Sequence, residues 1–138
     1  GLDPASTAIE QAREQCSKQR YPGKTPTFDL GAAEAMPYPD ATFRVVFMLD
    51  VIEHLPNPVR VLREAARVLR PQGRLLITTP AWQYGAWSDP VYHVDEYTAE
   101  ELVRQVTAAT RHNVPLGRAD LSTIGGVYRD LVLITQRQ

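Results

Sequence analysis

Apolar residues recur with helical spacing in three segments of the chain, and we predict a helix in each. The predicted helices run over residues 5–19, 58–69 and 98–111. Their inward-facing positions are Ile9, Ala12 and Cys16 in the first, Val59, Leu62, Ala66 and Leu69 in the second, and Leu102, Val103 and Val106 in the third. Thr7 with Glu10 and Thr98 with Glu101 have the spacing of a capping box, and Asn57 precedes a proline at the start of the second helix.

Four shorter segments are predicted as strands: residues 25–30, 43–49, 74–79 and 128–135. Residues 1–3 resemble the last residues of a further strand. Phe43–Leu49 and Arg74–Thr79 are almost continuously apolar, which is typical of strands buried on both faces of a parallel sheet. The last segment alternates in part, so we expect it to be antiparallel. Strands that alternate with helices predict an α/β fold with a Rossmann-like, doubly wound and mostly parallel sheet.

The composition narrows the class of protein. A chain of 138 residues can bury a core, and we treat residues 1–138 as a single domain. A net charge of -1 and scattered basic residues argue against nucleic-acid and membrane partners; Arg60, Arg63 and Arg67 are expected on a solvated helix face. The single cysteine, Cys16, allows no internal disulfide; we expect a buried, inert thiol and a cytoplasmic location.

Whole segments of the sequence resemble a known family. The middle of class I S-adenosylmethionine-dependent methyltransferases is similar to the segment DLGAAEAMPYPDATFRVVFMLDVIEHLPNPVRVLREAARVLRPQGRLLITTPA, and the nearest branch methylates small molecules. A later loop and the last strand of the same proteins resemble HVDEYTAEEL and GGVYRDLVLI. The resemblance implies a methyltransferase that uses S-adenosylmethionine as cofactor and a small molecule as methyl acceptor.

The resemblance also implies which residues contact the cofactor. Asp3 matches the acid that binds the ribose hydroxyls, and the alternative is that it only caps the helix that follows. The family's loop Gly-Asp-Ala-Glu reads GAAE here, so the aspartate that receives the adenine amine is missing, and backbone near Ala33 and Glu34 is left to contact the adenine edge. Leu49 and Asp50 match residues near the methionine part of the cofactor.

His54 is the candidate catalytic residue. It would face the methyl-acceptor pocket, and histidine is suited to accept a proton from a hydroxyl near neutral pH. The alternative is that Glu53 and His54 only cap the turn into the second helix. His93, Tyr97 and Trp82 belong to a long aromatic loop that is expected to cover the acceptor. A metal site is not expected, because the three histidines are far apart in the sequence and show no paired spacing.

One part of the family pattern has no counterpart, namely the first strand and its glycine-rich turn, which lets the backbone approach the cofactor closely. We therefore expect a domain truncated at its N-terminus, in which Gly1–Asp3 is too short to hold as a strand. Phe43–Leu49 would lose a neighbour and become an apolar edge. We expect this edge to pair with a second copy in a homodimer, or with a separate N-terminal segment.

Three hypotheses for the function remain. The chain is the greater part of a methyltransferase, weakly active or inactive by itself, or it is a non-catalytic methyltransferase-like binding or assembly module. The missing glycine turn and Ala32 favour the second hypothesis. The third is another nucleotide-binding α/β protein, such as a dehydrogenase, and the segments GAAEAMPYPD and LDVIEHL argue against it.

Overall fold

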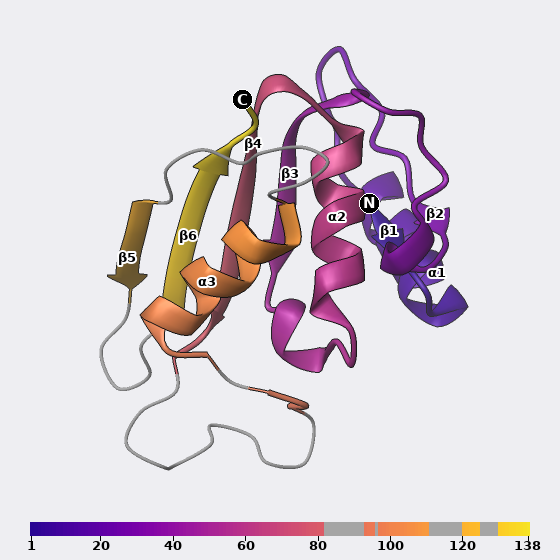
Figure 1. Ribbon diagram of the computed structural model, residues 1–138. Helices are drawn as coiled ribbons and strands as arrows, with labels where there is room; N and C mark the ends of the chain where they lie inside the picture. Colours follow the sequence, from indigo (N-terminus) through magenta and orange to yellow (C-terminus); the bar gives the residue numbers. More distant parts are fainter. Residues whose placement is uncertain (82–92, 96, 111–119, 125–129) are drawn as a thin grey trace. The chain divides into compact units, whose positions relative to one another are not determined.

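The computed structural model describes residues 1–81, 93–95, 97–110, 120–124 and 130–138 (Figure 1). The chain forms two compact units, Gly1–Pro37 and Tyr38–Gln138. Each unit is described by itself below.

The first unit is a small β-α-β arrangement followed by one short helical turn. Strands β1 (Leu2–Asp3) and β2 (Asp29–Leu30) pair in parallel and are joined by helix α1 (Ser6–Ser17). The turn η1 (Ala33–Ala35) comes after β2. The prediction that residues 1–3 cannot hold as a strand is wrong, because hydrogen bonds to β2 continue on both sides of the two paired residues. The predicted strand over residues 25–30 is reduced to its last two residues.

Helix α1 begins differently from the prediction. Thr7 lies inside the helix rather than at its cap, and the N-cap residue Ala5 makes no side-chain capping bond. The carboxylate of Asp3 instead accepts a hydrogen bond from the Ala5 amide at 2.8 Å. Ile9 is buried as expected, whereas Cys16 is only half-buried. Asp3 therefore does stabilise the start of α1, as its alternative role required.

The second unit contains a four-stranded sheet in the order β3-β4-β6-β5 (Figure 1). Its strands are β3 (Phe43–Leu49), β4 (Leu69–Pro80), β5 (Asp120–Ile124) and β6 (Asp130–Gln136). β3 and β4 are parallel, and β6 runs antiparallel to β4, as predicted for the last strand. β5 lies in a segment for which the sequence predicted no element.

Helices α2 (Pro58–Val68) and α3 (Ala99–Thr110) pack against each other and against this sheet. Both predicted starts are confirmed: the Asn57 side chain accepts a hydrogen bond from the Arg60 amide at 3.3 Å, and Thr98 and Glu101 bond reciprocally. The core residues between helices and sheet are Met48, Val61, Leu62, Ala65, Ala66, Leu75, Ile77, Leu102, Val106 and Leu133. The inner face of α2 thus includes Val61 and Ala65 and only partly Val59. Neither these helices nor α1 is long and apolar enough to cross a bilayer.

The opposite face of the sheet is apolar and exposed. Val45, Phe47 and Leu49 alternate along β3 and are 42%, 62% and 55% exposed, and Ile134 on β6 is 38% exposed. The prediction that β3 is buried on both faces is wrong, because the helices of this unit cover only the face that carries Met48. Among the described strands β3 has one neighbour, β4, so β3 is an edge of this sheet, as predicted.

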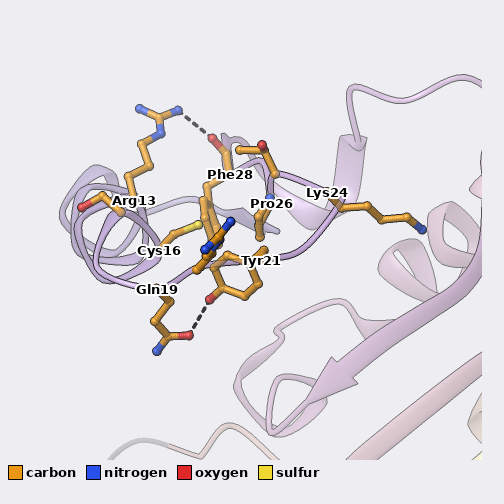
Figure 2. Close-up of a pocket in the computed structure, with 10 residues that line it drawn as sticks. Arg13, Cys16, Gln19, Tyr21, Lys24, Pro26 and Phe28 are labelled. Carbon is orange, nitrogen blue, oxygen red and sulfur yellow. Dashed lines mark hydrogen bonds between the residues drawn. The ribbon is translucent and has the colours of Figure 1, made fainter.

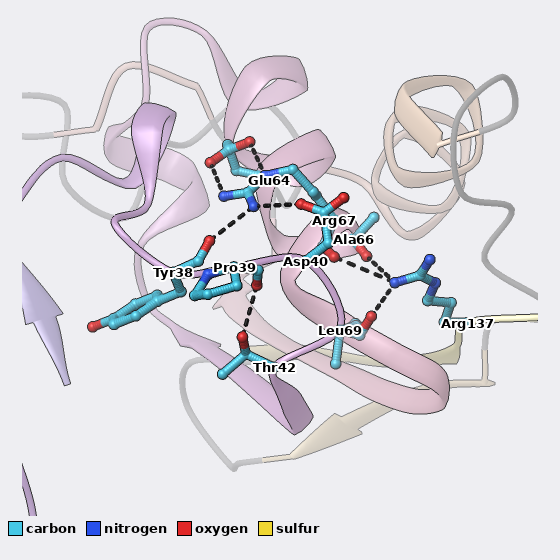
Figure 3. Close-up of polar contacts among 9 residues, drawn as sticks. All are labelled: Tyr38, Pro39, Asp40, Thr42, Glu64, Ala66, Arg67, Leu69 and Arg137. Carbon is cyan, nitrogen blue, oxygen red and sulfur yellow. Dashed lines mark hydrogen bonds and ion pairs between the residues drawn. The ribbon is translucent and has the colours of Figure 1, made fainter.

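Arg67 ties α2 to the loop that leads into β3 (Figure 3). Its guanidinium donates to both carboxylate oxygens of Glu64 at 2.7 and 2.8 Å, to Asp40 at 2.7 Å and to the Tyr38 carbonyl at 2.8 Å. Close by, Arg137 donates to backbone carbonyls at the end of α2. The expectation of a purely solvated face is therefore wrong for Arg67. It is also incomplete for Arg63, which is exposed but donates to the Ala109 carbonyl at 3.2 Å, while Arg60 is exposed as expected.

Candidate functional site

The parallel strands β3 and β4 end next to each other, with Leu49 opposite Thr78. In open α/β sheets, ligands bind beyond the carboxyl ends of such strands. The residues expected at this edge are in place, because Leu49 is exposed at the last position of β3 and Asp50 follows it, also exposed. An apolar side chain and a carboxylate thus stand together at the end of the sheet.

Asp50 is held by the neighbouring strand. Its amide donates to the Thr78 carbonyl at 3.1 Å, and the Thr78 hydroxyl donates to Asp50 Oδ1 at 3.0 Å. The backbone of Asp50 is left-handed, with a φ of 51°. Aspartate tolerates this conformation better than most residues, because its short polar side chain can bond locally. The carboxylate is therefore fixed in place at the end of β3.

Three residues after the strand ends, the turn η2 (Ile52–His54) carries a buried acid next to an exposed histidine. Ile52 is fully buried and anchors the turn, and Glu53 is 1% exposed. Glu53 Oε2 accepts a hydrogen bond from the Thr79 hydroxyl at 3.0 Å. The His54 side chain is 44% exposed, and its Nε2 lies 3.9 Å from Glu53 Oε1. Glu53 is therefore more deeply buried than a residue that only caps a turn would need to be.

The backbone of the same turn brings in His93 from a distant segment. The Glu53 carbonyl accepts hydrogen bonds from the amides of Val94 and Asp95, at 2.7 and 3.2 Å. This places the ring of His93 against that of His54, with centroids 5.0 Å apart in an edge-to-face arrangement. Two residues predicted for the acceptor site are thus neighbours, although their positions in the sequence gave no sign of it.

Burial controls the electrostatics of this region. It raises the pKa of Glu53, and the charge of Asp50 raises it further, against the opposing hydrogen bonds and His54. Burial also raises the pKa of Tyr97 to about 12, with added contributions from Asp95 and Glu53. Tyr97 is 2% exposed, so its hydroxyl stays protonated at neutral pH. Trp82, the other aromatic residue predicted for the acceptor site, lies outside the described residues.

The remaining predicted residues lie in the first unit. Asp3 ends β1, and its carbonyl accepts a hydrogen bond from the Gly31 amide at 3.0 Å, which places the GAAE loop beside it. A Cβ atom at Gly31 would lie 3.0 Å from Leu2 Cδ1, so the loop packs closely against that side chain. Ala33 and Glu34 form the η1 turn that follows. These three predicted cofactor residues are therefore together in one unit, as are Leu49, Asp50 and His54 in the other.

A separate hollow of about 410 Å³ lies in the first unit (Figure 2). It is formed by the end of α1 and the chain leading into β2, and Arg13 closes one side by donating to the Phe28 carbonyl at 2.6 Å. Cys16 borders this hollow, which corrects the expectation of a fully buried thiol. The hollow lies where the chain enters β2, whereas Asp3 stands at the carboxyl end of the parallel strands. It is therefore not the site that the cofactor residues outline.

Sequence comparisons identify the family. Residues 1–77 match the methyltransferase domain family, so the chain belongs to that family. Over 77 residues it is 38% identical to 27-O-demethylrifamycin SV methyltransferase of Amycolatopsis mediterranei, a match that covers 56% of this chain and 28% of that protein. It is 37% identical over 105 residues to a Mycobacterium tuberculosis protein named as a probable S-adenosylmethionine-dependent methyltransferase, covering 73% of this chain and 36% of the relative. The chain spans about a third of the length of these relatives.

Solved structures confirm the Rossmann-like α/β fold. An S-adenosylmethionine-dependent methyltransferase of Methanosarcina mazei matches 99% of this chain with a TM-score of 0.75 at 19% identity, covering 80% of that protein. The SpnF cyclase matches 99% with a TM-score of 0.79 at 17% identity, covering 64% of that protein. S-adenosylmethionine is the cofactor of the family to which the chain belongs.

The described residues fit this cofactor chemically. A carboxylate has acceptor capacity beyond one hydrogen bond, so Asp3 can cap α1 and still receive ribose hydroxyls. Asp50 offers a negative charge to a ligand that carries an ammonium and a sulfonium group, and Leu49 offers an apolar surface. Ala32 stands where the family resemblance implies an acceptor for the adenine amine, and its side chain offers none.

Sequence reasoning missed the parts of the site that depend on contacts between strands. The sequence pattern indicates a capping role for Glu53 and assigns no role to Thr78 or Thr79. A signal was present, because two threonines end a strand that is otherwise apolar and charged residues follow the neighbouring strand. Only the register of β3 and β4 shows that these groups meet.

Proposed function

We propose that this chain binds S-adenosylmethionine and forms part of a methyltransferase that acts on a small-molecule acceptor. The observation that carries the proposal is the row of groups beyond β3, from the fixed carboxylate of Asp50 to the exposed His54 backed by Glu53. Membership of the methyltransferase domain family supports it. The rifamycin methyltransferase, which is named for a small-molecule acceptor, supports the class of acceptor.

The residues take distinct roles in this proposal. Asp3 accepts hydrogen bonds from the ribose, backbone near Ala33 and Glu34 contacts the adenine, and Leu49 and Asp50 hold the methionine part. The cofactor supplies a methyl group on a sulfonium, which is open to direct displacement. His54 accepts the proton that an acceptor hydroxyl loses, and His93 and Tyr97 help to exclude water from the reacting groups.

A non-catalytic binding module is the second candidate. Ala32 replaces a side-chain acceptor, and the loss of one hydrogen-bond partner for a buried amine costs about 1–3 kcal/mol. The SpnF cyclase adds a second point, because it has this fold and its name is not that of a methyltransferase. The two candidates differ in whether a methyl group is transferred.

Calorimetric titration of the 138-residue chain with S-adenosylhomocysteine tests the binding step. We expect a Kd in the micromolar range, about -8 kcal/mol, weakened at least tenfold by Asp50→Asn and by Asp3→Asn. Glu10→Gln, an exposed change on α1, is the matched control and leaves binding unchanged. The proposal fails if no heat of binding develops at millimolar ligand.

Transfer is measured separately, by incubating the chain with methyl-labelled cofactor and a panel of hydroxylated small molecules. The methyltransferase proposal is supported if the native chain forms labelled product and the His54→Ala variant forms none while it still binds S-adenosylhomocysteine. Binding without transfer to any member of the panel favours the module.

We also propose that β3 pairs with β3 of a second copy. Its edge has no strand beside it among the described residues, and its exposed face is apolar. A two-fold axis would align two β3 strands antiparallel. The only charged residue of the strand, Arg44, would then stand at opposite ends of the pair, without facing its own copy.

A further inference from the structure

One oxygen of the buried Glu53 carboxylate is left without a hydrogen-bond partner in the described part of the chain. Oε2 is bonded to Thr79, but Oε1 is buried and makes no such bond. Buried carboxylate oxygens are normally paired or bound to a metal, because burial removes the water that would otherwise stabilise their charge. The orphaned Oε1 is directed at His54, whose Nε2 lies 3.9 Å away.

Two imidazoles stand beside this oxygen. Glu53, His54 and His93 each offer one ligand atom, and these three atoms lie within 4.8 Å of one another. They come from two segments that are held together by the hydrogen bonds from Val94 and Asp95 to the Glu53 carbonyl. The acid is buried, His93 is half-buried and His54 is exposed, so the cluster is anchored at one end and open to solvent at the other.

We propose that Glu53, His54 and His93 bind a divalent transition-metal ion, with Zn²⁺ as the ion of choice. Two histidines and one glutamate are a ligand set of catalytic zinc sites, which keep a further position open for water or substrate. Ligand atoms around a tetrahedral Zn²⁺ are roughly 3.4 Å apart, given metal-ligand bonds of about 2.0–2.2 Å. The two histidine side chains therefore need to move inward by about 1 Å, while Thr79 keeps the carboxylate in place.

The local charge favours a cation. The charged groups that act most on Glu53 are His54 and Asp50, and Asp95 acts with Glu53 on the neighbouring Tyr97. No lysine or arginine is among these groups. Among the described residues that act on these two groups, three carboxylates meet no lysine or arginine, and such a local charge attracts a divalent ion and disfavours an anion. The sequence-based expectation of no metal rested on spacing along the chain, which does not reveal that the two histidines meet.

The metal would change the role of His54 in the proposed methyl transfer. The His54 nitrogen that binds the ion could not also accept a proton. The bound ion would instead activate the acceptor hydroxyl, because a metal ion lowers the pKa of a hydroxyl group that it binds. This consequence rests on the proposed function, whereas metal binding itself does not. A metal-binding measurement without cofactor therefore separates the two.

The test is a calorimetric titration of Zn²⁺ into the 138-residue chain after treatment with EDTA. We expect one ion per chain with a Kd of about 10 µM or tighter, and at least tenfold weaker binding in both Glu53→Gln and His93→Ala. Glu100→Gln, an exposed change in the first turn of α3, is the control and leaves the Kd unchanged. Co²⁺ gives a second readout, because visible absorption bands typical of tetrahedral Co²⁺ should appear in the native chain and be lost in His93→Ala.

Weaker binding of Zn²⁺, or binding that survives both substitutions, overturns the proposal. Circular dichroism confirms that each variant is folded, and His93→Ala decides the matter if Glu53→Gln does not fold. Zinc binding by a chain that fails to bind S-adenosylhomocysteine would support the metal site and reject the proposed function. The reverse result would reject the metal site alone.

Discussion

Two hydrogen bonds join Asp50, just after β3, to Thr78 near the end of β4. The Asp50 amide donates to the Thr78 carbonyl, and the Thr78 hydroxyl donates to the Asp50 carboxylate. Thr78→Val keeps the shape of the side chain but removes the hydroxyl that fixes the Asp50 carboxylate. One hydrogen bond is worth about 1 kcal/mol, so we expect S-adenosylhomocysteine to bind about fivefold more weakly. Calorimetry measures the change, with Thr25→Val as a control in the first unit. An unchanged Kd would show that the position of Asp50 does not matter for the ligand.

Gly73 is required by close packing rather than by its backbone angles. A methyl group at this position would lie 2.8 Å from the Arg70 carbonyl and 3.1 Å from the Arg44 carbonyl, where the pairing of β3 and β4 shifts register. Gly73→Ala should therefore lower the free energy of unfolding by about 1–3 kcal/mol, as measured by urea denaturation.

The neighbouring residue offers a contrast of opposite sign. Gln72 has a φ of 61°, which glycine adopts without strain, and its side chain is exposed. Gln72→Gly should leave stability unchanged or raise it by up to about 1 kcal/mol. A loss of stability in Gln72→Gly as large as that in Gly73→Ala would show that the whole turn is intolerant, and that the close approach is not the cause.

The capping box of α3 should make stability depend on pH. Hydrogen bonds from the Thr98 hydroxyl and amide lower the pKa of Glu101 from its ordinary value of 4.5. The stabilisation is therefore fully present above the unfolded-state value and is lost as the pH falls through the lower folded-state value. Glu101→Gln should lower the thermal midpoint at about pH 7 but match the native chain at about pH 2. Glu100→Gln is the control, because Glu100 does not accept the hydrogen bonds from Thr98. An equal change of the thermal midpoint in both variants would show that the capping box is not the cause of the pH dependence.

The exposed face of β3 should control self-association. Phe47→Lys places a charge in the middle of the proposed pairing surface, and we expect it to convert a dimer into a monomer. Light scattering during gel filtration measures the mass. Ile134→Lys makes the same change on β6, away from the edge, and should leave the dimer intact. A native chain that is monomeric would reject pairing with a second copy, and pairing with a separate strand-bearing segment would then remain as the alternative.

Local signals in the sequence predicted much of the secondary structure. The starts of α2 and α3 follow from Asn57 and from Thr98 with Glu101, since these side chains bond to amides only three residues away. The bounds of β3 were predicted without error from its apolar run. The start of α1 was predicted to within one residue, but its capping box was wrong, because Asp3 and not Thr7 bonds to the start of the helix, at the Ala5 amide.

The family resemblance predicted individual residues of the candidate site, such as Asp50 and His54. The contacts that those residues make could be seen only in the tertiary structure. The register of β3 against β4 places Thr78 beside Asp50, and hydrogen bonds to the Glu53 carbonyl bring His93 to His54. The sequence therefore determined the helices and the strand β3, because capping and side-chain periodicity act within a few residues, whereas it gave no sign of β5. The contacts of Glu53 were decided by the fold, because strand register and burial join segments that are far apart along the chain.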